Sequence, residues 1–304
     1  GLVGSEMCIR DREIELDYNA FKNKDWSVSV GANATFVKNK IKNLPATMKE
    51  NGYISGSKKW LEGKSIYEFW LRQWHGVDPQ TGDGLYVADV SKYNQGNIGT
   101  GDGNITQSQF DEYKKTVVTI DGKELTNSYT YAKYDFSGSS IPDVFGGFNV
   151  RVSYKNFDLA AVFSYQLGGQ ILDTNYATMM SMTEFGYAQS PDLLKAWKQA
   201  GDITEVPRID NSAAHTTNIG QSYSTRWLTS SDYLNLRSVT IGYQFPKAWL
   251  SKVMLKSARL NLTAENLFML KARQGLNPMA NYSGVTYNEY MPSRNITLGL
   301  NVSF

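Results

Sequence analysis

The sequence predicts an all-β fold, a transmembrane antiparallel β-barrel of which this chain supplies a part, about seven strands with long extracellular loops. Three observations support this prediction. Seven segments alternate apolar and polar residues with the period of a β-strand. Short and long connections follow one another strictly along the chain. The 304 residues are rich in aromatic side chains (13%) and in glycine (26 residues), a composition that favours β structure.

The seven segments place apolar side chains on one face and mostly polar side chains on the other. They cover residues 14–20, 26–36, 148–154, 157–165, 239–245, 259–268 and 295–304. The last one shows the pattern most clearly, since Ile296, Leu298 and Leu300 alternate with Thr297 and Gly299. Side chains that alternate in this way point to opposite faces of a sheet. Each segment is therefore expected to separate two different media.

The connections favour a barrel over a soluble β-sandwich, which would also alternate. Residues 23–25, residues 155–156 and residues 246–257 are short joins, whereas the stretches 41–143, 168–230 and 271–292 are long. Outer-membrane barrels have short periplasmic turns and long extracellular loops. Loops of this length are uncommon in compact soluble domains. An open sheet of seven strands would leave unsatisfied edges in lipid, so we expect further strands N-terminal to this segment.

The first twelve residues, GLVGSEMCIRDR, match nothing that follows and resemble a translated sequencing-adapter remnant. We therefore expect residues 1–12 to be a non-native leader and residues 13–304 to be the C-terminal part of a barrel. The leader holds Cys8, the only cysteine of the chain. Without it no disulfide framework and no cysteine-based zinc site is possible.

Composition and motifs exclude several function classes. The chain has 31 basic and 29 acidic residues, and this net charge of +2 provides no field for binding nucleic acid. No run of about 18 apolar residues occurs, so no transmembrane helix is expected. No paired carboxylates and no Ser/His/Asp arrangement can be argued from spacing, so the chain is predicted not to be an enzyme and to need no cofactor. His75 and His215 lie far apart and show no metal-binding spacing.

Residues 97–113, NIGTGDGNITQSQFDEY, invite comparison with a calcium loop. Ile98 and Thr100 stand where carboxylates are required, and Gln109 replaces the bidentate glutamate, so an EF-hand is excluded. A looser calcium site through Asp102, Asp111 and Glu112 stays open. No phosphate loop is present, because GTGDG is not followed by G-K-[ST].

The long connections contain two further features. Aromatic residues crowd the first of them, and they could stack on sugar rings, contact a partner, or form the loop's own small core. These residues are Trp60, Tyr67, Phe69, Trp70 and Trp74, of which Trp60, Tyr67, Trp70 and Trp74 are the candidate contacts. In the second long connection, residues 190–201 predict a short helix with Ser190 as N-cap, Pro191 at the first position and Gly201 at the end.

Charged residues on the polar faces of the strands are candidate lumen groups. They could contact a plug or a substrate, or they could pair with one another in a solvated lumen. These residues are Arg151, Asp158, Arg237, Arg259 and Glu265. The terminal Phe304 is expected either to act as an assembly signal or to be one more lipid-facing aromatic residue of the periplasmic girdle.

Six motifs in order give the sequence a family resemblance. They are WHGVDPQTGDGLY (74–86), SSIPDVFGGFNVRVSYKNFDLAAVFSYQLGG (139–169), WKQAGDITEVPR (197–208), YLNLRSVTIGYQFP (233–246), ENLF (265–268) and the terminal NITLGLNVSF. With these motifs, residues 13–304 resemble the last part of SusC/RagA-type TonB-dependent transporters of Bacteroidetes. Each motif alone is weak, and the specificity comes from their order over nearly 300 residues.

The resemblance implies a bacterial outer-membrane barrel of about 22 strands with a plugged lumen. It implies energy from TonB, coupled through an N-terminal region absent from this sequence, and a SusD-like surface lipoprotein acting as a lid. The implied cargo is an oligosaccharide or a peptide. Two alternatives stay open: a passive porin-type barrel, which a plug domain encoded upstream would exclude, and a secreted carbohydrate-binding β-sandwich, which would dissolve without detergent.

Overall fold

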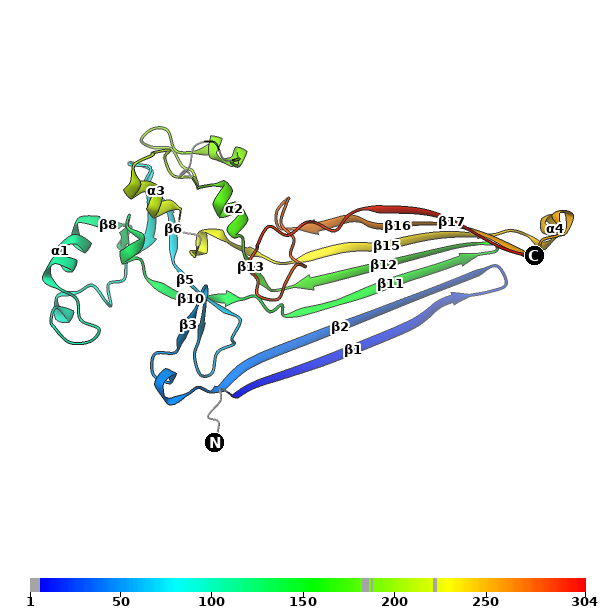
Figure 1. Cartoon of the computed structure of the whole chain (residues 1–304), viewed down its shortest axis with the longest axis horizontal. Helices are drawn as coiled ribbons and strands as arrows, with labels where there is room; N and C mark the ends of the chain where they lie inside the picture. The colour runs from blue at the N-terminus through cyan, green and yellow to red at the C-terminus, as the bar shows by residue number, and fades with distance from the viewer. Residues whose placement is uncertain (1–5, 182–185, 187, 221–222) are drawn as a thin grey trace.

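The computed structural model describes residues 6–181, 186, 188–220 and 223–304. Its main feature is one long, seven-stranded antiparallel sheet, with the long connections gathered at one end and the short turns at the other (Figure 1). The strands follow the order of the chain: β1 (Glu6–Lys22), β2 (Trp26–Asn43), β11 (Val144–Tyr154), β12 (Phe157–Leu167), β15 (Tyr233–Gln244), β16 (Ser257–Lys271) and β17 (Asn295–Ser303). All seven predicted strands are present, and the prediction of an all-β chain is confirmed.

Each of the three short turns has a defined local structure. In the first, Asn23 Oδ1 accepts from the backbone N–H groups of Asp25 at 2.9 Å and Trp26 at 2.7 Å. In the second, Lys155 has a positive φ of 50° between β11 and β12. The third contains α4 (Lys247–Leu250) and the 3-10 helix Ser251–Val253. These three turns fix the register of the hairpins that they join.

The long connections are folded rather than irregular. The first contains two small sheets, one of β3 (Tyr53–Ser55), β4 (Lys58–Trp60), β5 (Glu68–Arg72) and β10 (Tyr134–Ser139), the other of β6 (Trp74–Val77), β7 (Gly84–Val87), β8 (Val117–Ile120) and β9 (Lys123–Thr126). It also holds α1 (Gln107–Thr116). The second contains β13 (Gln170–Leu172) paired with β14 (Leu228–Ser230), together with α2 (Thr174–Met179) and α3 (Ala213–Ile219). In the third, residues 272–294, no helix or strand is assigned. Sequence alternation did not reveal the strands of the connections, which have three to six residues each.

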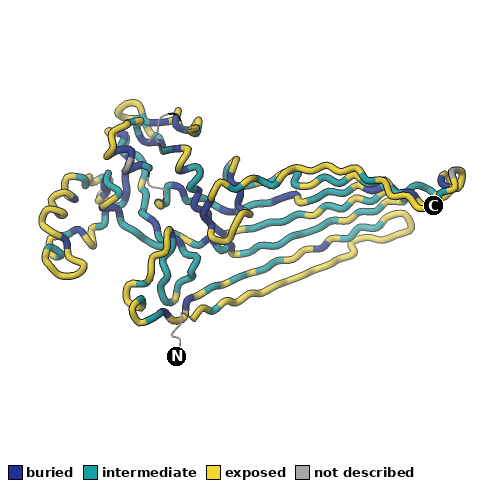
Figure 2. Tube along the Cα trace, in the orientation of Figure 1, coloured by how far each residue is buried: buried dark blue, intermediate teal, exposed yellow. Residues whose placement is uncertain are grey.

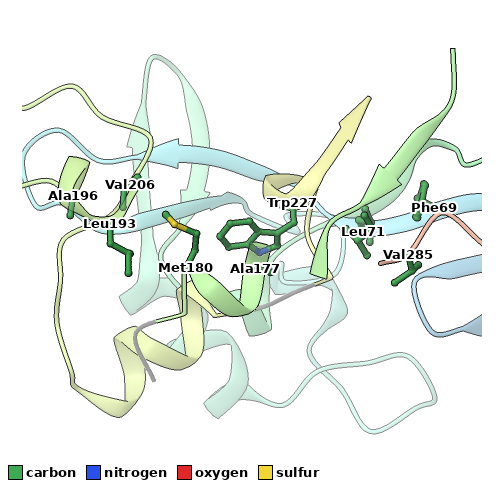
Figure 3. Close-up of a cluster of buried hydrophobic side chains, with 10 residues drawn as sticks. Phe69, Leu71, Ala177, Met180, Leu193, Ala196, Val206, Trp227 and Val285 are labelled. Atoms are coloured by element: carbon green, nitrogen blue, oxygen red, sulfur yellow. The ribbon is translucent and has the colours of Figure 1, made fainter. Parts of the chain in front are cut away.

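Most of the buried core lies in the connections, and the main sheet contributes only a few buried apolar residues, such as Ile41, Leu236 and Ala258 (Figure 2). Its largest cluster joins all three long connections around Trp227 (Figure 3). Phe69 and Leu71 come from the first connection, Leu172 and Trp227 from the second, and Val285 from the third. The three connections therefore form one packed body at one end of the sheet.

The helix predicted over residues 190–201 is shorter than expected and is a 3-10 helix, Pro191–Lys195. Its start is correct, because the Ser190 side chain accepts from the N–H of Asp192 and Pro191 takes the first position. It ends early because Ala196 is extended and Trp197 turns away, with its backbone N–H donating to Val206 O at 3.0 Å. Gly201, at φ 96°, belongs to a later turn.

Among the residues described, no helix combines the length and the apolar character needed to cross a membrane.

Candidate functional site

Strand register lines up the polar residues of all seven strands on one face of the sheet. One row of successive partners runs Asp17, Gly31, Asn149, Val162, Ser238, Glu265, Asn295, and the next polar row toward the short turns runs Ser29, Arg151, Ala160, Thr240, Thr263, Thr297. The apolar row between them runs Tyr18, Val30, Val150, Ala161, Val239, Ala264, Ile296 on the opposite face. The two-faced pattern of each strand is thus a property of the whole sheet.

Two candidate lumen residues form an ion pair across this polar face. Arg259 Nη2 lies 2.7 Å from Asp158 Oδ2, although the two residues belong to β16 and β12, with β15 between them. Gly242 of β15 pairs with Asp158 and lies beneath the ion pair, where a Cβ atom would come 2.6 Å from Asp158 Oδ1. The absence of a side chain at Gly242 gives the two charged groups room to meet.

The other three candidate lumen residues are arranged differently. Arg151 pairs with Ser29 and Ala160 and is exposed. The Glu265 carboxylate accepts from Asn295 Nδ2 at 3.3 Å. Arg237 lies at a register shift between Leu236 and Ser238, so simple alternation does not fix the face that it takes. Asn266, with φ 52°, lies at the matching irregularity of β16.

The aromatic residues predicted as contacts pack largely against other rings of their own connection. Trp60 lies 5.3 Å from Tyr53, Trp70 lies 4.9 Å from Phe136, and Trp74 lies 5.1 Å from Tyr86, all between ring centroids. All four candidates, Trp60, Tyr67, Trp70 and Trp74, are half-buried, whereas Phe69 is fully buried. These packing partners support the interpretation that the rings form the core of the connection.

Burial changes the proton affinity of two groups beside these rings. Lys58 Nζ lies 3.1 Å from the centroid of Phe69 and donates to Tyr67 O at 2.8 Å. Burial lowers the pKa of Lys58 to about 7. Arg226 lies between the rings of Trp74 and Trp227, and burial lowers its pKa to about 10.

Two of the sequence motifs dock onto each other. Trp197 Nε1 and Gly201 N both donate to Pro79 O, at 2.9 and 2.8 Å, and Arg208 N donates to Gly82 O at 2.9 Å. Gly82 has φ 73°, and a Cβ there would overlap the ring of Trp197. We call residues 78–83 together with 197–208 the motif clamp. Its two halves are more than a hundred residues apart in the sequence, which is why the sequence did not reveal their contact.

Arg208 of the motif clamp forms ion pairs with two carboxylates. Arg208 Nε lies 3.0 Å from Asp83 Oδ1, and Arg208 Nη1 lies 2.8 Å from Asp210 Oδ2. The buried His215 has its Nε2 atom 2.8 Å from Arg208 O. His75 is exposed elsewhere in the first connection.

The looser calcium site is not assembled. Gln107 donates to Asp111 Oδ1 and Tyr131 donates to Glu112 Oε2, and within the described ranges no three His, Cys, Asp or Glu side chains gather to hold a metal ion. Gln109, the residue that excluded an EF-hand, completes a capping box with Thr106 at the start of α1.

A cavity of about 220 Å³ lies where the polar face meets the three connections. Its lining contains no charged side chain and combines aromatic rings with amide and hydroxyl groups. The lining residues are Ser140, Pro142, Phe145, Gln166, Gln170, Ile171, Ser231, Tyr233, Pro278, Met279, Ala280, Asn281, Tyr282 and Gly284. The sequence does not reveal this cavity, because its walls come from parts of the chain that only the fold brings together.

The relatives found by comparison with known proteins are named alike, as TonB-dependent receptors. No protein-family model matches the chain. The TonB-dependent receptors P3 and P39 of Formosa agariphila are 26% and 24% identical to it, over 99% and 96% of this chain but only 28% and 31% of their own length. These relatives are named as receptors, in agreement with the prediction that the chain is not an enzyme.

Solved structures give the same result for the fold. A structure of the RagAB peptide transporter matches with a TM-score of 0.75 and 22% identity, covering 99% of this chain and 30% of the matched one. The RagAB peptide importer in the 'closed-closed' state matches with a TM-score of 0.75 and 23% identity. This chain thus spans less than a third of the length of these relatives. Sequence and fold together confirm the resemblance drawn from the motifs: the chain is similar to a segment of TonB-dependent receptors, and its fold is that of the matching part of the RagAB structures.

Proposed function

We propose that this segment forms part of the wall of a bacterial outer-membrane barrel that imports a large nutrient with energy supplied through TonB. The observation that carries the proposal is the apolar face of the sheet, which is continuous across seven strands and exposed. Ile296, Leu298 and Leu300 are 72%, 70% and 63% exposed, and Leu16 is 68% exposed. An exposed apolar surface of this extent must be covered by an apolar environment. Lipid suits a sheet of long strands that have one apolar and one polar face.

Aromatic rings at the short-turn end support the same proposal. Trp26 lies 4.3 Å from Tyr154, and Phe157 lies 4.5 Å from Tyr243, between ring centroids. These four residues are neighbours in one row of the apolar face. Aromatic girdles mark the edges of the apolar band in outer-membrane barrels. The rings would then lie at the periplasmic interface, and the packed connections would lie outside the cell.

The cavity suggests where cargo is recognised. Its uncharged lining of rings, amides and hydroxyls suits a neutral polar chain, which agrees with an oligosaccharide or a peptide as cargo. The solved relatives are described as peptide transporters and importers, which favours peptides. A SusD-like lipoprotein would cover the packed connections from outside.

The two alternatives fit the sheet less well. A carbohydrate-binding β-sandwich needs a second sheet over the apolar face, and the smaller sheets of the described residues lie in the connections instead. A passive porin is less well supported, because the relatives of this chain are named TonB-dependent receptors.

Charges placed on neighbouring residues of β17 test the proposal. Leu298→Arg in the full-length receptor puts a charge on the apolar face, and the expected cost in lipid is roughly 2–4 kcal/mol. Thr297→Arg is the matched control, because Thr297 pairs with Thr263 on the polar face. We expect the first variant to be depleted from the outer membrane and the second to assemble, as measured by membrane abundance and heat-modifiable migration. Equal tolerance of both variants would contradict the membrane assignment of the faces.

A further inference from the structure

The outward face of β2 changes its chemistry near the long-connection end. From Trp26 to Phe36 this face presents apolar side chains, and the next three residues on it are Lys38, Lys40 and Lys42. All three lysines are exposed. We call them the basic row. Lys38 and Lys40 continue the apolar face in strict alternation, and Lys42 follows at a register shift, where Met7 pairs with Ile41 and Glu6 with Asn43.

The opposite face of β2 is occupied over the same stretch. Ile41 is 3% exposed, and its N–H donates to Lys64 O at 2.9 Å. Asn39 Oδ1 accepts from Ser65 Oγ at 3.0 Å and from Ile66 N at 3.1 Å. The first long connection thus covers the inner side, and the lysines are left facing outward.

The basic row carries charge without a counterion of its own. In the described part of the chain, no ion pair joins any of the three lysines to a carboxylate. Strand register places Arg10 of β1 opposite Lys38, and like charges directly opposite destabilise a sheet. Because Arg10 belongs to the segment predicted to be non-native, the inference rests on the three lysines alone. Three neighbouring cations on one face favour an anionic partner.

We propose that the basic row binds phosphate headgroups of anionic lipid at the outer surface of the membrane. This inference rests on the proposed function, which puts the apolar face in lipid. Lysines directly beyond an apolar band can keep their stems against acyl chains while their ammonium groups reach the headgroups. Successive lysines on one face are about 6.6 Å apart along a strand, and the headgroup layer is roughly 5–8 Å deep on each side of the bilayer. In a strand tilted by about 40° the three lysines cover roughly 10 Å along the membrane normal, so Lys38 and Lys40 lie in the headgroup layer and Lys42 at its outer edge.

The test uses the full-length receptor that contains this segment, purified in neutral detergent and placed in phosphatidylcholine nanodiscs with or without phosphatidylglycerol. The variant carries Lys38→Gln, Lys40→Gln and Lys42→Gln. The control carries Lys22→Gln, Lys24→Gln and Lys247→Gln, three exposed lysines at the short-turn end. The readouts are the midpoint of thermal unfolding and the amount of phosphatidylglycerol retained after detergent washing.

We expect phosphatidylglycerol to raise the unfolding midpoint of the wild type and of the control. The basic-row variant should lose most of that rise and retain about tenfold less lipid at low salt. An undiminished response of the basic-row variant would overturn the inference. The inference would also be overturned if inorganic phosphate raised the unfolding midpoint of the wild type as phosphatidylglycerol does, because the site would then bind a soluble anion. Failure of the wild type to give a heat-modifiable barrel would instead count against the proposed function.

Discussion

At the scale of single residues, small side chains decide where charged groups meet. Gly242 leaves space for the Asp158–Arg259 ion pair, and Gly31 does the same for Asp17 and Asn149, which lie on either side of it. Glycine normally weakens a strand because it has more backbone freedom to lose. On this polar face Gly242 allows an ion pair between two strands that are not adjacent. Asp158 and Arg259 therefore interact across the intervening strand β15.

Lys58 gives a residue-scale prediction for the first connection. Its pKa of about 7 in the folded chain lies below the ordinary value of 10.5, because the ammonium group is buried. Between these two pH values the unfolded connection binds a proton that the folded one does not, so stability should rise with pH across this window. Below about pH 7 both forms are protonated and the full cost of burial is present. Proteolysis of the first connection in the purified receptor should therefore slow as the pH rises from 7 toward 10.

Lys58→Met removes the titrating group and should make proteolysis independent of pH in that range. Lys59→Met is the matched control. Lys59 is the neighbouring residue, and its ammonium group lies 4.2 Å from the centroid of the Trp70 ring. This control should keep the pH response of the wild type. A wild type whose proteolysis rate does not change with pH would show that burial of Lys58 has no such effect.

At the scale of elements, the motif clamp should control the order of the second connection. Gly82→Ala places a side chain at φ 73° and against the ring of Trp197. Backbone strain of this kind costs roughly 1–3 kcal/mol before any overlap is counted. We expect residues 168–232 to become sensitive to protease on intact cells, while outer-membrane abundance stays close to normal. Gln80→Ala, at an exposed position in the same turn, should behave like the wild type, and equal sensitivity of the two variants would disprove the role of the clamp.

Predictability from the sequence also differs between elements. The long strands were predictable, because period-two alternation over many residues is a strong signal and their two faces differ in polarity. The bulges at Arg237 and Asn266 were not, since a single extra residue leaves no compositional mark. Trp197 shows why the helix predicted over residues 190–201 is longer than the observed helix, Pro191–Lys195. Its ring docks on Pro79, a contact across more than a hundred residues, and that contact ends the helix that local propensity extends to Gly201.

The candidate site was predictable to a similar degree. Alternation indicated Arg151, Asp158, Arg259 and Glu265 on the polar face, and register places all four in polar rows. Their partners depend on which strand lies beside which, so the ion pair over Gly242 needed the fold. The cavity could not be predicted without the fold, because Gln166, Ser140 and Asn281 come from separate parts of the chain.

At the scale of the whole molecule, Phe304 offers a prediction about assembly. It is 80% exposed and follows the last residue of β17 at the short-turn end. As a girdle residue, Phe304→Ala should cost roughly 1–3 kcal/mol of burial and leave most of the protein assembled. As an assembly signal, the same change should deplete the receptor from the outer membrane while refolded protein stays stable in micelles. We expect depletion, measured by abundance in cells beside thermal stability in detergent, and normal abundance would leave only the girdle role.

The order of strands in the main sheet has a kinetic consequence. Every strand pairs with the next one in the chain, so no strand has to cross over another. Hairpins can therefore be added one at a time, and each addition closes only the loop that it brings with it. That loop is three residues between β1 and β2 but about a hundred between β2 and β11. Joining β11 to β2 is then the slowest pairing of the sheet. A folded first connection would hasten it, because Ile41 and Asn39 at the end of β2 already hold that connection in place.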